Sequence, residues 1–205
     1  MAINVEDVKK VVDGMAEVII KNEVYFCDLD SVAGDGDFGM SVAKGFKQLK
    51  SEWDDLDTTD IGTFLKSAGM IITEYCGGAS GPIWGTAFRS AAKYAKGKTE
   101  LEVDEIPGLF EAGIAGIQKR GGAKLGDKTL LDALIPAAEA MKENSSKGLK
   151  EMFEAATKAA EEGAEATKKI SAKKGRASYV GDRSLEHPDA GAMAMGVIFK
   201  ELTKE

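Results

Sequence analysis

Apolar residues recur every three or four positions along most of the chain, which is the spacing of one face of an α-helix. In the first segment Val5, Val8, Val12 and Ile19 form such a stripe, and Phe26 continues it. No segment shows the alternation of apolar and polar residues between turns that is typical of a half-buried strand. The pattern therefore predicts an all-α protein without a β-sheet.

Helix-start and helix-stop residues divide this pattern into eight predicted helices. Thr58, Thr59 or Asp60 is a suitable N-cap for one of them, and Pro82 suits the first position of another. The predicted helices cover about residues 5–26, 39–52, 60–75, 82–95, 104–119, 128–142, 149–170 and 190–204. Because most connections are short, we expect antiparallel neighbours in a bundle. No linker divides the chain, so we expect one domain over residues 1–205.

The glycines are concentrated between the predicted helices. The chain has 24 glycines and only 4 prolines. Just over half of the glycines lie in four segments, which we call the glycine loops: GDGDFG (34–39), GGASGPIWG (77–85), GGAKLGD (121–127) and GRASYVGDRSLEHPDAG (175–191). Helix C-caps account for only a few of them. Since alternate junctions of an antiparallel bundle lie at the same end, we expect the four loops to face one ligand together.

Charge and cysteine content narrow the class of protein. The net charge is −7 and no basic stripe is present, which argues against nucleic-acid binding. No apolar run reaches the ~18–20 residues that span a bilayer, and the charged N-terminus lacks a signal-peptide pattern. Cys27 and Cys76 lack metal-type spacing, so we expect both to be reduced and buried. These features predict a cytoplasmic protein with no nucleic-acid or membrane partner.

The first glycine loop carries Asp35 and Asp37, and Asp30 lies four residues before it. Carboxylates on a chain that glycines allow to bend sharply are suitable ligands for a hard divalent cation such as Mg²⁺. The helix expected to begin near residue 39 adds backbone N–H groups for an anion. The alternative is a solvated acidic turn in which an aspartate caps that helix, because turns are rich in Asp and Gly. The residues alone leave both interpretations open.

Two other motifs fit this loop by letter only. Gly34, Gly36 and Gly39 match the G-x-G-x-x-G pattern of dinucleotide sites, but a helix and not a strand precedes them. Asp35 and Asp37 would also repel a pyrophosphate. A calcium-binding EF-hand loop needs Glu at its twelfth position, and none of the possible starting aspartates gives one. Both motifs are therefore rejected.

The other glycine loops carry weaker signals. The second, before Pro82, can present backbone N–H groups to phosphate, or can simply be a glycine cap followed by a helix start. The third is not a P-loop, because Asp127 precedes Lys128 and no strand leads into it. The remaining interpretation is that this loop forms one glycine-lined wall of a ligand site. In the fourth, Arg176 and Arg183 are candidate phosphate or base contacts or ordinary surface charges. His187, the single histidine, is expected to fix the loop.

Taken together, the four loops resemble the ADP-binding L subunits of phosphotransferase-dependent dihydroxyacetone kinases, the DhaL type of Dak2 domain. The matching pieces are LDSVAGDGDFG, GGASGPIWGTAF, GGAKLGDKTLLDAL and KGRASYVGDRSLEHPDAGA, in this order across residues 29–192. The resemblance implies a closed, barrel-like bundle of eight antiparallel helices with the nucleotide site in the loops at one end.

The resemblance also implies a role for individual residues. The family's metal-binding aspartates correspond to Asp30, Asp35 and Asp37, and its two phosphate-binding stretches correspond to Phe38, Gly39, Met40 and Ser41 and to Gly78, Ala79 and Ser80. Its adenine and ribose pocket corresponds to Gly121 and Leu130. Its nucleotide-contacting arginine corresponds to Arg176, and its closing turn corresponds to Asp189, Ala190 and Gly191. Relatives often carry His or Thr at position 38 and Met at position 130. A side-chain role at position 38 is therefore in doubt, whereas Leu130 keeps an apolar wall.

The implied function is phosphoryl transfer without a protein nucleophile, which needs positioning and charge neutralisation. ADP or ATP, held through two Mg²⁺ ions, would be rephosphorylated in place by a phosphotransferase-system subunit and would phosphorylate dihydroxyacetone on a separate kinase subunit. A homodimer is also considered. One alternative is the nucleotide-binding domain of a fatty-acid-kinase-like enzyme, which normally begins a longer chain, whereas this sequence ends at Glu205. The other is a non-catalytic, Mg-nucleotide-dependent interaction protein.

Overall fold

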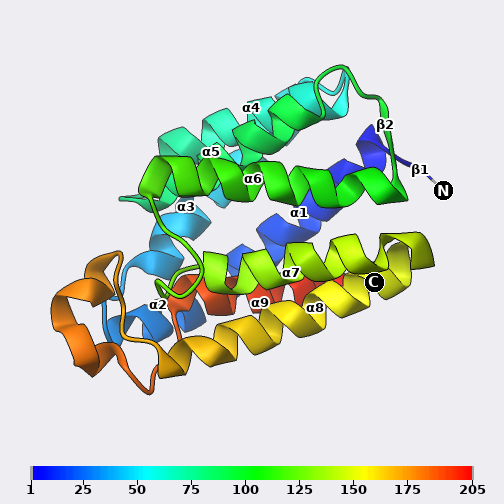
Figure 1. Ribbon diagram of the computed structural model, residues 1–205. Coiled ribbons are helices and arrows are strands. Elements are labelled where there is room, and N and C mark those ends of the chain that lie inside the picture. Colours follow the sequence, from blue (N-terminus) through cyan, green and yellow to red (C-terminus); the bar gives the residue numbers. More distant parts are fainter. Residues whose placement is uncertain (1, 205) are drawn as a thin grey trace.

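The computed structural model describes residues 2–204, and this part of the chain is mainly helical, as predicted (Figure 1). Its α-helices are α1 (Val5–Lys21), α2 (Glu23–Ser31), α3 (Phe38–Ser51), α4 (Ile61–Tyr75), α5 (Ser80–Tyr94), α6 (Ile106–Gly121), α7 (Leu131–Asn144), α8 (Leu149–Ala166) and α9 (Ala190–Leu202). Its 3-10 helices are η1 (Trp53–Asp55), η2 (Val103–Glu105), η3 (Ser145–Lys147), η4 (Thr167–Lys169) and η5 (Arg176–Ser184), and its strands are β1 (Ala2–Asn4) and β2 (Glu100–Glu102). Met1 and Glu205, which the predicted domain includes, lie outside the described residues.

Side-chain caps explain where several helices begin. Asn4 and Asp7 form a capping box at the start of α1, in which each side chain accepts a hydrogen bond from the other residue's backbone N–H. Of the three predicted caps for α4, Asp60 is the one used, and its carboxylate accepts from the Thr63 N–H at 2.9 Å. Helix α6 is followed by Gly122 in the left-handed conformation, a common C-cap.

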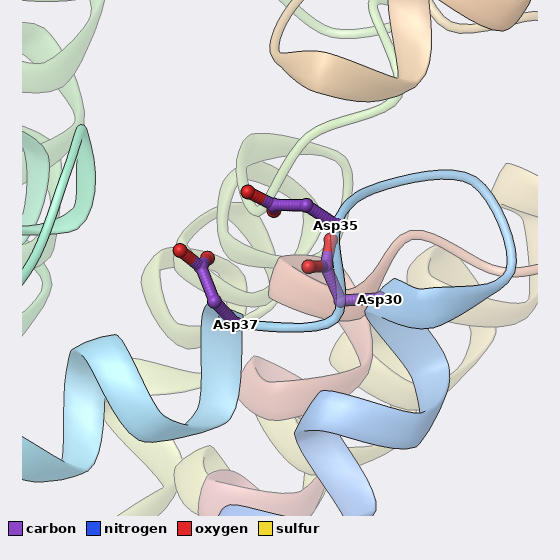
Figure 2. A group of neighbouring side chains, drawn as sticks. All are labelled: Asp30, Asp35 and Asp37. Carbon is purple, nitrogen blue, oxygen red and sulfur yellow. The ribbon is translucent and has the colours of Figure 1, made fainter.

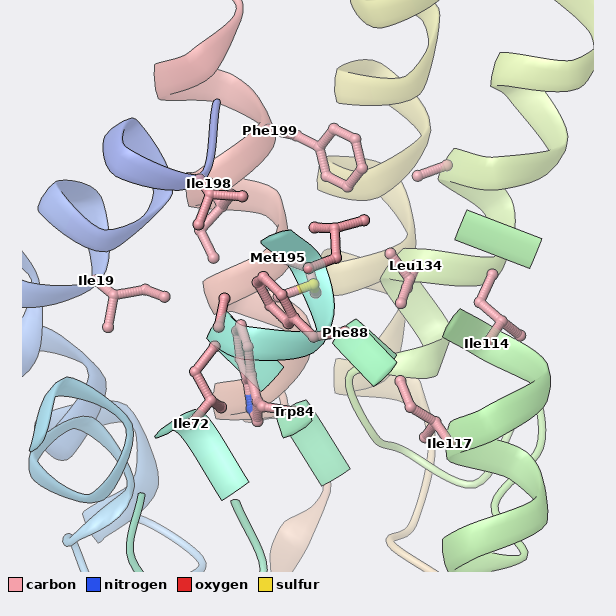
Figure 3. Packing of buried hydrophobic residues seen from close by; sticks show 14 of the residues in the cluster. Ile19, Ile72, Trp84, Phe88, Ile114, Ile117, Leu134, Met195, Ile198 and Phe199 are labelled. Carbon is pink, nitrogen blue, oxygen red and sulfur yellow. The ribbon is translucent and has the colours of Figure 1, made fainter. Parts of the chain in front are cut away.

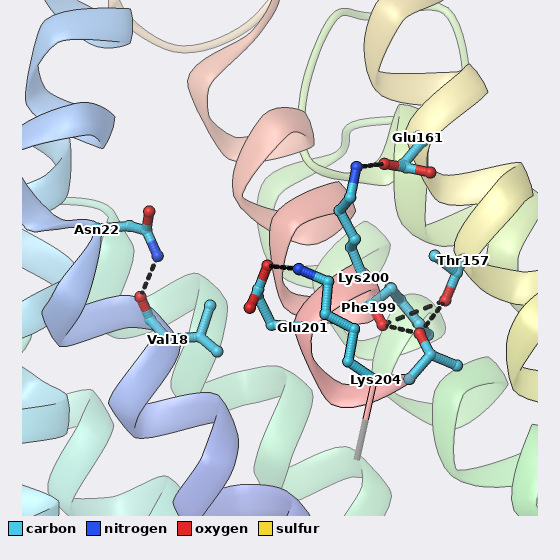
Figure 4. Close-up of polar contacts among 9 residues, drawn as sticks. Val18, Asn22, Thr157, Glu161, Phe199, Lys200, Glu201 and Lys204 are labelled. Atoms are coloured by element: carbon cyan, nitrogen blue, oxygen red, sulfur yellow. Dashed lines mark hydrogen bonds and ion pairs between the residues drawn. The ribbon is translucent and has the colours of Figure 1, made fainter.

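The first predicted helix is two helices, so the described chain has one α-helix more than expected. Helix α1 ends and α2 begins on either side of Asn22. The Asn22 side-chain amide donates to the Val18 carbonyl oxygen at 2.8 Å, which competes with the helical backbone pattern (Figure 4). The apolar repeat runs across this break, and that is why the pattern alone did not reveal it.

Two further details of the prediction were wrong. Strands β1 and β2 pair antiparallel, with Ile3 opposite Leu101, so a minimal sheet joins the N-terminus to the α5–α6 connection. Each strand has only three residues, too few to show an alternating pattern. Helix α5 begins at Ser80, which places Pro82 third in the helix and still within the first turn, where its missing N–H is tolerated.

The helices pack mainly against their neighbours in sequence. Helices α4, α5 and α6 form one group and α7, α8 and α9 another, and α1 lies between them in contact with α3 and α9 (Figure 1). Helix α3 also contacts α4, and α6 contacts α7, so the two groups are connected into one bundle. The helical class is thus confirmed, and the closed barrel stays a prediction. None of the described helices is both long enough and apolar enough to cross a lipid bilayer.

One apolar cluster fills the space between the helices (Figure 3). Phe46 of α3 meets Trp84 of α5 edge-on, with ring centroids 5.8 Å apart, and Phe88 lies one turn further along α5. Cys27 and Cys76 are free thiols as expected, but Cys27 is only half-buried. Burial raises the pKa of Cys76 to about 11, which keeps its thiol protonated at neutral pH.

Polar contacts join the C-terminal helix to its neighbour. The Thr157 hydroxyl on α8 donates to the Phe199 carbonyl oxygen and lies 2.7 Å from the Thr203 hydroxyl (Figure 4). The Lys200 ammonium lies 2.8 Å from a Glu161 carboxylate oxygen on α8. Because both contacts lie toward the C-terminal end of α9, they hold the end of the bundle that is opposite to the glycine loops.

Two helical glycines offer a matched test of this packing. An added Cβ at Gly163 in α8 would lie 2.2 Å from the Asp132 carbonyl oxygen of α7, whereas at Gly113 in α6 its nearest neighbour would be 3.5 Å away. We expect Gly113→Ala to stabilise the protein by up to about 1 kcal/mol, because alanine favours helix. Gly163→Ala should destabilise it by about 1–3 kcal/mol through overpacking. Urea unfolding measures both, and equal effects would contradict the close α7–α8 contact.

Candidate functional site

The four glycine loops lie at the same end of the bundle, as expected from alternate junctions (Figure 1). Contacts join these loops, or residues close beside them, in pairs. The Gly77 N–H donates to the Ser41 carbonyl oxygen at 3.0 Å, and the Arg176 Nε lies 2.9 Å from an Asp35 carboxylate oxygen. Gly191 lies against Leu130, where an added Cβ would be 3.3 Å from the Leu130 Cβ. Residues far apart in sequence therefore share one site.

Three carboxylates converge beside the first glycine loop (Figure 2). Asp30 comes from the last turn of α2, Asp35 from the loop, and Asp37 from the position just before α3. One carboxylate oxygen from each lies within 4.8 Å of the other two. Such a group of hard oxygen atoms on a short loop suits a divalent cation.

The loop is bent by bonds to Asp30. Its carbonyl oxygen accepts from the Gly34 N–H at 2.6 Å, and its carboxylate accepts from the Gly36 N–H at 2.9 Å. An added Cβ on Gly34 would lie only 2.2 Å from the Asp30 carboxylate, so this turn requires glycine. The interleaved glycines therefore allow Asp35 and Asp37 to return toward Asp30.

The electrostatics of the cluster favour a bound cation. Burial, and next the negative charge of Asp35, raise the pKa of Asp37, while the Arg176 guanidinium partly opposes this. Asp37 occupies the N-cap position of α3 without a capping hydrogen bond from its side chain. The interpretation of Asp37 as a helix cap therefore lacks its characteristic bond, and the carboxylate is directed toward two others.

The start of α3 lies beside the aspartates. The Phe38 N–H donates to the Asp30 carboxylate at 3.4 Å, and the Phe38 ring packs near Phe26, with centroids 6.2 Å apart. Gly39 is buried, and an added Cβ there would be 1.9 Å from the Glu23 carbonyl oxygen. Met40 is exposed at 57%. The Phe38 side chain therefore serves the core, which accounts for the absence of a polar residue at this position.

The start of α5 is next to the start of α3. Gly78 and Ala79 are exposed, and open space lies where a Gly78 side chain would be. Ala79 precedes α5 without a side-chain cap. Since the Gly77–Ser41 hydrogen bond joins the two loops, the N-termini of two helices of 14 and 15 residues begin side by side at this end. Helix N-termini attract anions.

The remaining predicted residues lie at the α6–α7 and α8–α9 junctions. Gly121 is the exposed last residue of α6, and Leu130 is half-buried just before α7. Asp189 caps α9 by accepting from the Ala192 N–H at 2.8 Å, and burial raises the pKa of Asp189 to about 7. Ala190 is buried, and Gly191 faces Leu130. Leu130 and residues 189–191 are thus neighbours.

Arg176 reaches the aspartates from the α8–α9 connection, far along the chain from the first glycine loop. It is the first residue of η5, and its side chain is 67% exposed while its Nε contacts Asp35. Arg183 lies toward the other end of η5, and its role stays a prediction. His187 does fix the loop, but through its carbonyl oxygen, which accepts from the Lys128 ammonium at 2.7 Å.

Sequence reasoning missed Lys128 and Asp132. Lys128 was considered only as a P-loop lysine, yet it is 2% exposed and its ammonium is surrounded by backbone carbonyls. Asp132 is 4% exposed and accepts from the Gly126 and Thr129 N–H groups. The sequence feature that could have indicated them is the position of Lys128 and Asp132 on either side of the apolar pair Leu130–Leu131.

Comparisons with known proteins agree with this geometry. The DAK2 domain family matches residues 32–204. The "PEP-dependent dihydroxyacetone kinase 2, ADP-binding subunit DhaL" of Listeria innocua is 40% identical over 201 residues, which cover 95% of this chain and 93% of the relative. The "PEP-dependent dihydroxyacetone kinase, ADP-binding subunit DhaL" of Escherichia coli is 38% identical over 83% of this chain and 82% of its own length.

A solved structure shares the fold. The crystal structure of the dihydroxyacetone kinase from C. freundii in complex with AMP-PNP and Mg²⁺ matches with a TM-score of 0.78 and 27% sequence identity. The match covers 96% of this chain and 33% of that one, so the chain spans about a third of the length of that kinase.

Proposed function

The chain belongs to the DAK2 domain family, and we propose that it is the nucleotide-binding subunit of a dihydroxyacetone kinase. It holds Mg-ADP or Mg-ATP as a bound coenzyme, accepts a phosphoryl group from a phosphotransferase-system subunit, and transfers it to dihydroxyacetone on a partner subunit. Two relatives named as ADP-binding subunits of PEP-dependent dihydroxyacetone kinases support this, with 40% and 38% identity. The observation that carries the proposal is the convergence of three carboxylates beside two helix N-termini.

The residues present fit magnesium. Asp30, Asp35 and Asp37 offer only oxygen ligands. Burial first, and the negative charge of Asp35 next, raise the pKa of Asp37, and a divalent cation would offset both effects. We propose that these three aspartates hold two ions, because carboxylates can bridge a pair of ions and still leave positions for phosphate oxygens. When bound, magnesium supplies charge neutralisation at the phosphate oxygens.

The chain's own residues would position the nucleotide. Residues 38–41 and 78–80 lie at the starts of α3 and α5, and the positive ends of these helices favour phosphate oxygens. Arg176, held beside Asp35, offers a planar guanidinium that suits a phosphate. Gly121 and Leu130 would line the adenine and ribose, and residues 189–191 would close that side. No protein nucleophile is required, because orientation and electrostatic stabilisation carry phosphoryl transfer.

Other subunits complete the reaction in this proposal. The relatives are subunits of PEP- or PTS-dependent kinases, which supports an assembly of several chains. We propose that one partner holds dihydroxyacetone and another donates the phosphoryl group, and that residues 1–205 act as one nucleotide-binding domain. The single apolar cluster supports the one-domain part of this proposal. The homodimer considered above stays a prediction.

The proposal is tested by identifying what the purified protein releases. We expect denaturation to liberate close to one adenine nucleotide per chain together with magnesium, because a bound coenzyme stays with the protein during purification. Mass spectrometry of the supernatant and elemental analysis measure the two components. A protein that emerges empty and binds no Mg-ADP in calorimetry would contradict the function.

A further inference from the structure

We propose that Lys128 is a positioning residue of the nucleotide site, because its ammonium holds together the two ends of the segment that carries Arg176. This inference rests on the proposed function. We call residues 171–183 the Arg176 segment. It projects from the bundle at the same end as the aspartates and is drawn in orange in Figure 1. Lys128 itself lies in the α6–α7 loop, on a different part of the chain.

Four backbone carbonyls surround the Lys128 ammonium. Before the Arg176 segment, the carbonyl oxygens of Thr167 and Ile170 accept from Nζ at 2.9 and 3.1 Å. After it, those of Ser184 and His187 accept at 2.5 and 2.7 Å. One ammonium therefore joins the point where the segment leaves the bundle to the point where it returns.

The position of Lys128 is unusual for a lysine. Its side chain is buried, with 2% of the residue exposed, and its backbone φ is +62°, a region that L side chains rarely adopt. A buried ammonium is unfavourable unless hydrogen bonds replace its water. Burial lowers the pKa of Lys128, while the negative charges of Asp189 and Asp132 raise it. The four carbonyls and the two carboxylates together account for a cation at this depth.

The Arg176 segment depends on its ends for its position. Tyr179, near its middle, is 89% exposed, whereas Ala172, near its start, is buried. The Ser184 hydroxyl accepts from the Ala172 N–H at 2.9 Å, and the Lys173 N–H donates to the Asp127 carbonyl oxygen at 3.1 Å. These bonds act at the same two ends as Lys128. The segment thus has a firm base and an exposed tip.

The consequence for the site is the placement of Arg176. Only five residues separate Arg176 from Ile170, whose carbonyl Lys128 binds, and its Nε reaches Asp35 at 2.9 Å. If the two ends of the Arg176 segment separate, the Arg176 guanidinium is unchanged, but it is no longer held in position beside the aspartates. Lys128 would therefore act on nucleotide binding through Arg176 and not through a contact of its own.

A double-mutant cycle tests this dependence. We expect Lys128→Met and Arg176→Ala each to weaken Mg-ADP binding about ten- to a hundredfold, the size of a lost charge-assisted contact. The double variant should bind about as weakly as Arg176→Ala alone, because both changes remove the same contribution. Lys50→Met, which removes a lysine paired with Asp13 and Glu17, should bind as the wild type does. Calorimetry measures the affinities of the wild type and of the four variants.

Two outcomes overturn the inference: a Lys128→Met variant that binds Mg-ADP normally, or a double variant in which the two losses multiply. Circular dichroism first checks that Lys128→Met keeps its helicity. If it does not, Lys128→Gln, which retains an N–H donor of shorter reach, replaces it in the cycle.

A nucleotide-free measurement separates this inference from the proposed function. We expect trypsin to cut Lys128→Met faster than wild type or Lys50→Met after Arg176 and Arg183, since the segment ends are no longer joined. If the wild type binds no Mg-ADP, the proposed function fails, and the tryptic pattern still decides whether Lys128 holds the segment. Unchanged cleavage of the segment contradicts that role.

Discussion

Asp37→Asn is expected to lower the affinity for Mg-ADP by at least about 100-fold. Changes to groups that merely support a metal ligand cost about 10–100-fold in metal affinity, and a carboxylate that holds the ion should cost no less. Asp37 is one of the three carboxylates that converge within 4.8 Å. Asn has nearly the same shape, but it removes the negative charge and replaces one carboxylate oxygen with an NH₂ donor.

The same substitution should not destabilise the protein without metal. Burial and the charge of Asp35 raise the pKa of Asp37 in the folded state, so this carboxylate is less favourable there than in the unfolded chain. The folded protein therefore binds more protons between the two pKa values, and the contribution of Asp37 to stability falls as pH rises through that range. Asn removes this term, so the melting temperature of the metal-free variant should equal or exceed that of the wild type.

Asp54→Asn is the control, because it changes the net charge equally at an exposed site in η1. It should leave Mg-ADP affinity unchanged. Calorimetry measures affinity and scanning calorimetry without metal measures stability. Unchanged nucleotide affinity in Asp37→Asn would show that the three-carboxylate site is wrong, and a large loss of metal-free stability would assign Asp37 a structural role instead.

Mg-ADP is expected to raise the melting temperature by about 5–10 °C when its concentration is 100 times the dissociation constant. Binding to the folded state alone adds about 2.7 kcal/mol of stability under those conditions. For a chain of 205 residues, each kcal/mol shifts the melting temperature by about 2–4 °C. The ligand would contact all four glycine loops.

Chelation of magnesium should reverse this stabilisation. The three carboxylates repel one another and the phosphates unless a cation lies between them, so ADP with excess EDTA should give almost no shift. Asp37→Asn with Mg-ADP should behave like the wild type with EDTA. A melting temperature that is insensitive to Mg-ADP, or a shift of equal size with EDTA present, would contradict a metal-dependent site at this end of the bundle.

The aspartate cluster was open to prediction because all its members lie within eight residues. Asp30, Asp35 and Asp37 are separated by glycines, and a short chain that must turn brings its carboxylates together whatever the rest of the fold does. The helical pattern was likewise local, since apolar spacing reports which face of a helix is buried. The break at Asn22 escaped because one side-chain hydrogen bond overrides a continuous apolar stripe.

Arg176 and Lys128 belong to a different category. A positive charge in a polar loop does not show by its sequence which partner it meets. The residue types made Arg176 and Arg183 equal candidates for a phosphate or base contact, and the resemblance singled out Arg176. Its contact with Asp35 joins residues 141 positions apart, and the Lys128 bonds reach 39 to 59 positions along the chain. Both contacts exist because the α2–α3, α6–α7 and α8–α9 junctions lie at the same end of the bundle.

Residue types and their local spacing were thus sufficient for the helical class, the acidic loop and the positions of the four glycine loops. Packing decided which loops meet, that the ammonium of Lys128 is buried, and that the Phe38 ring packs against the core. The reason is that helix periodicity and turn geometry act over a few residues, whereas burial of a charge depends on what several distant segments place around it. Only the folded chain surrounds Lys128 with carbonyls from both ends of the Arg176 segment.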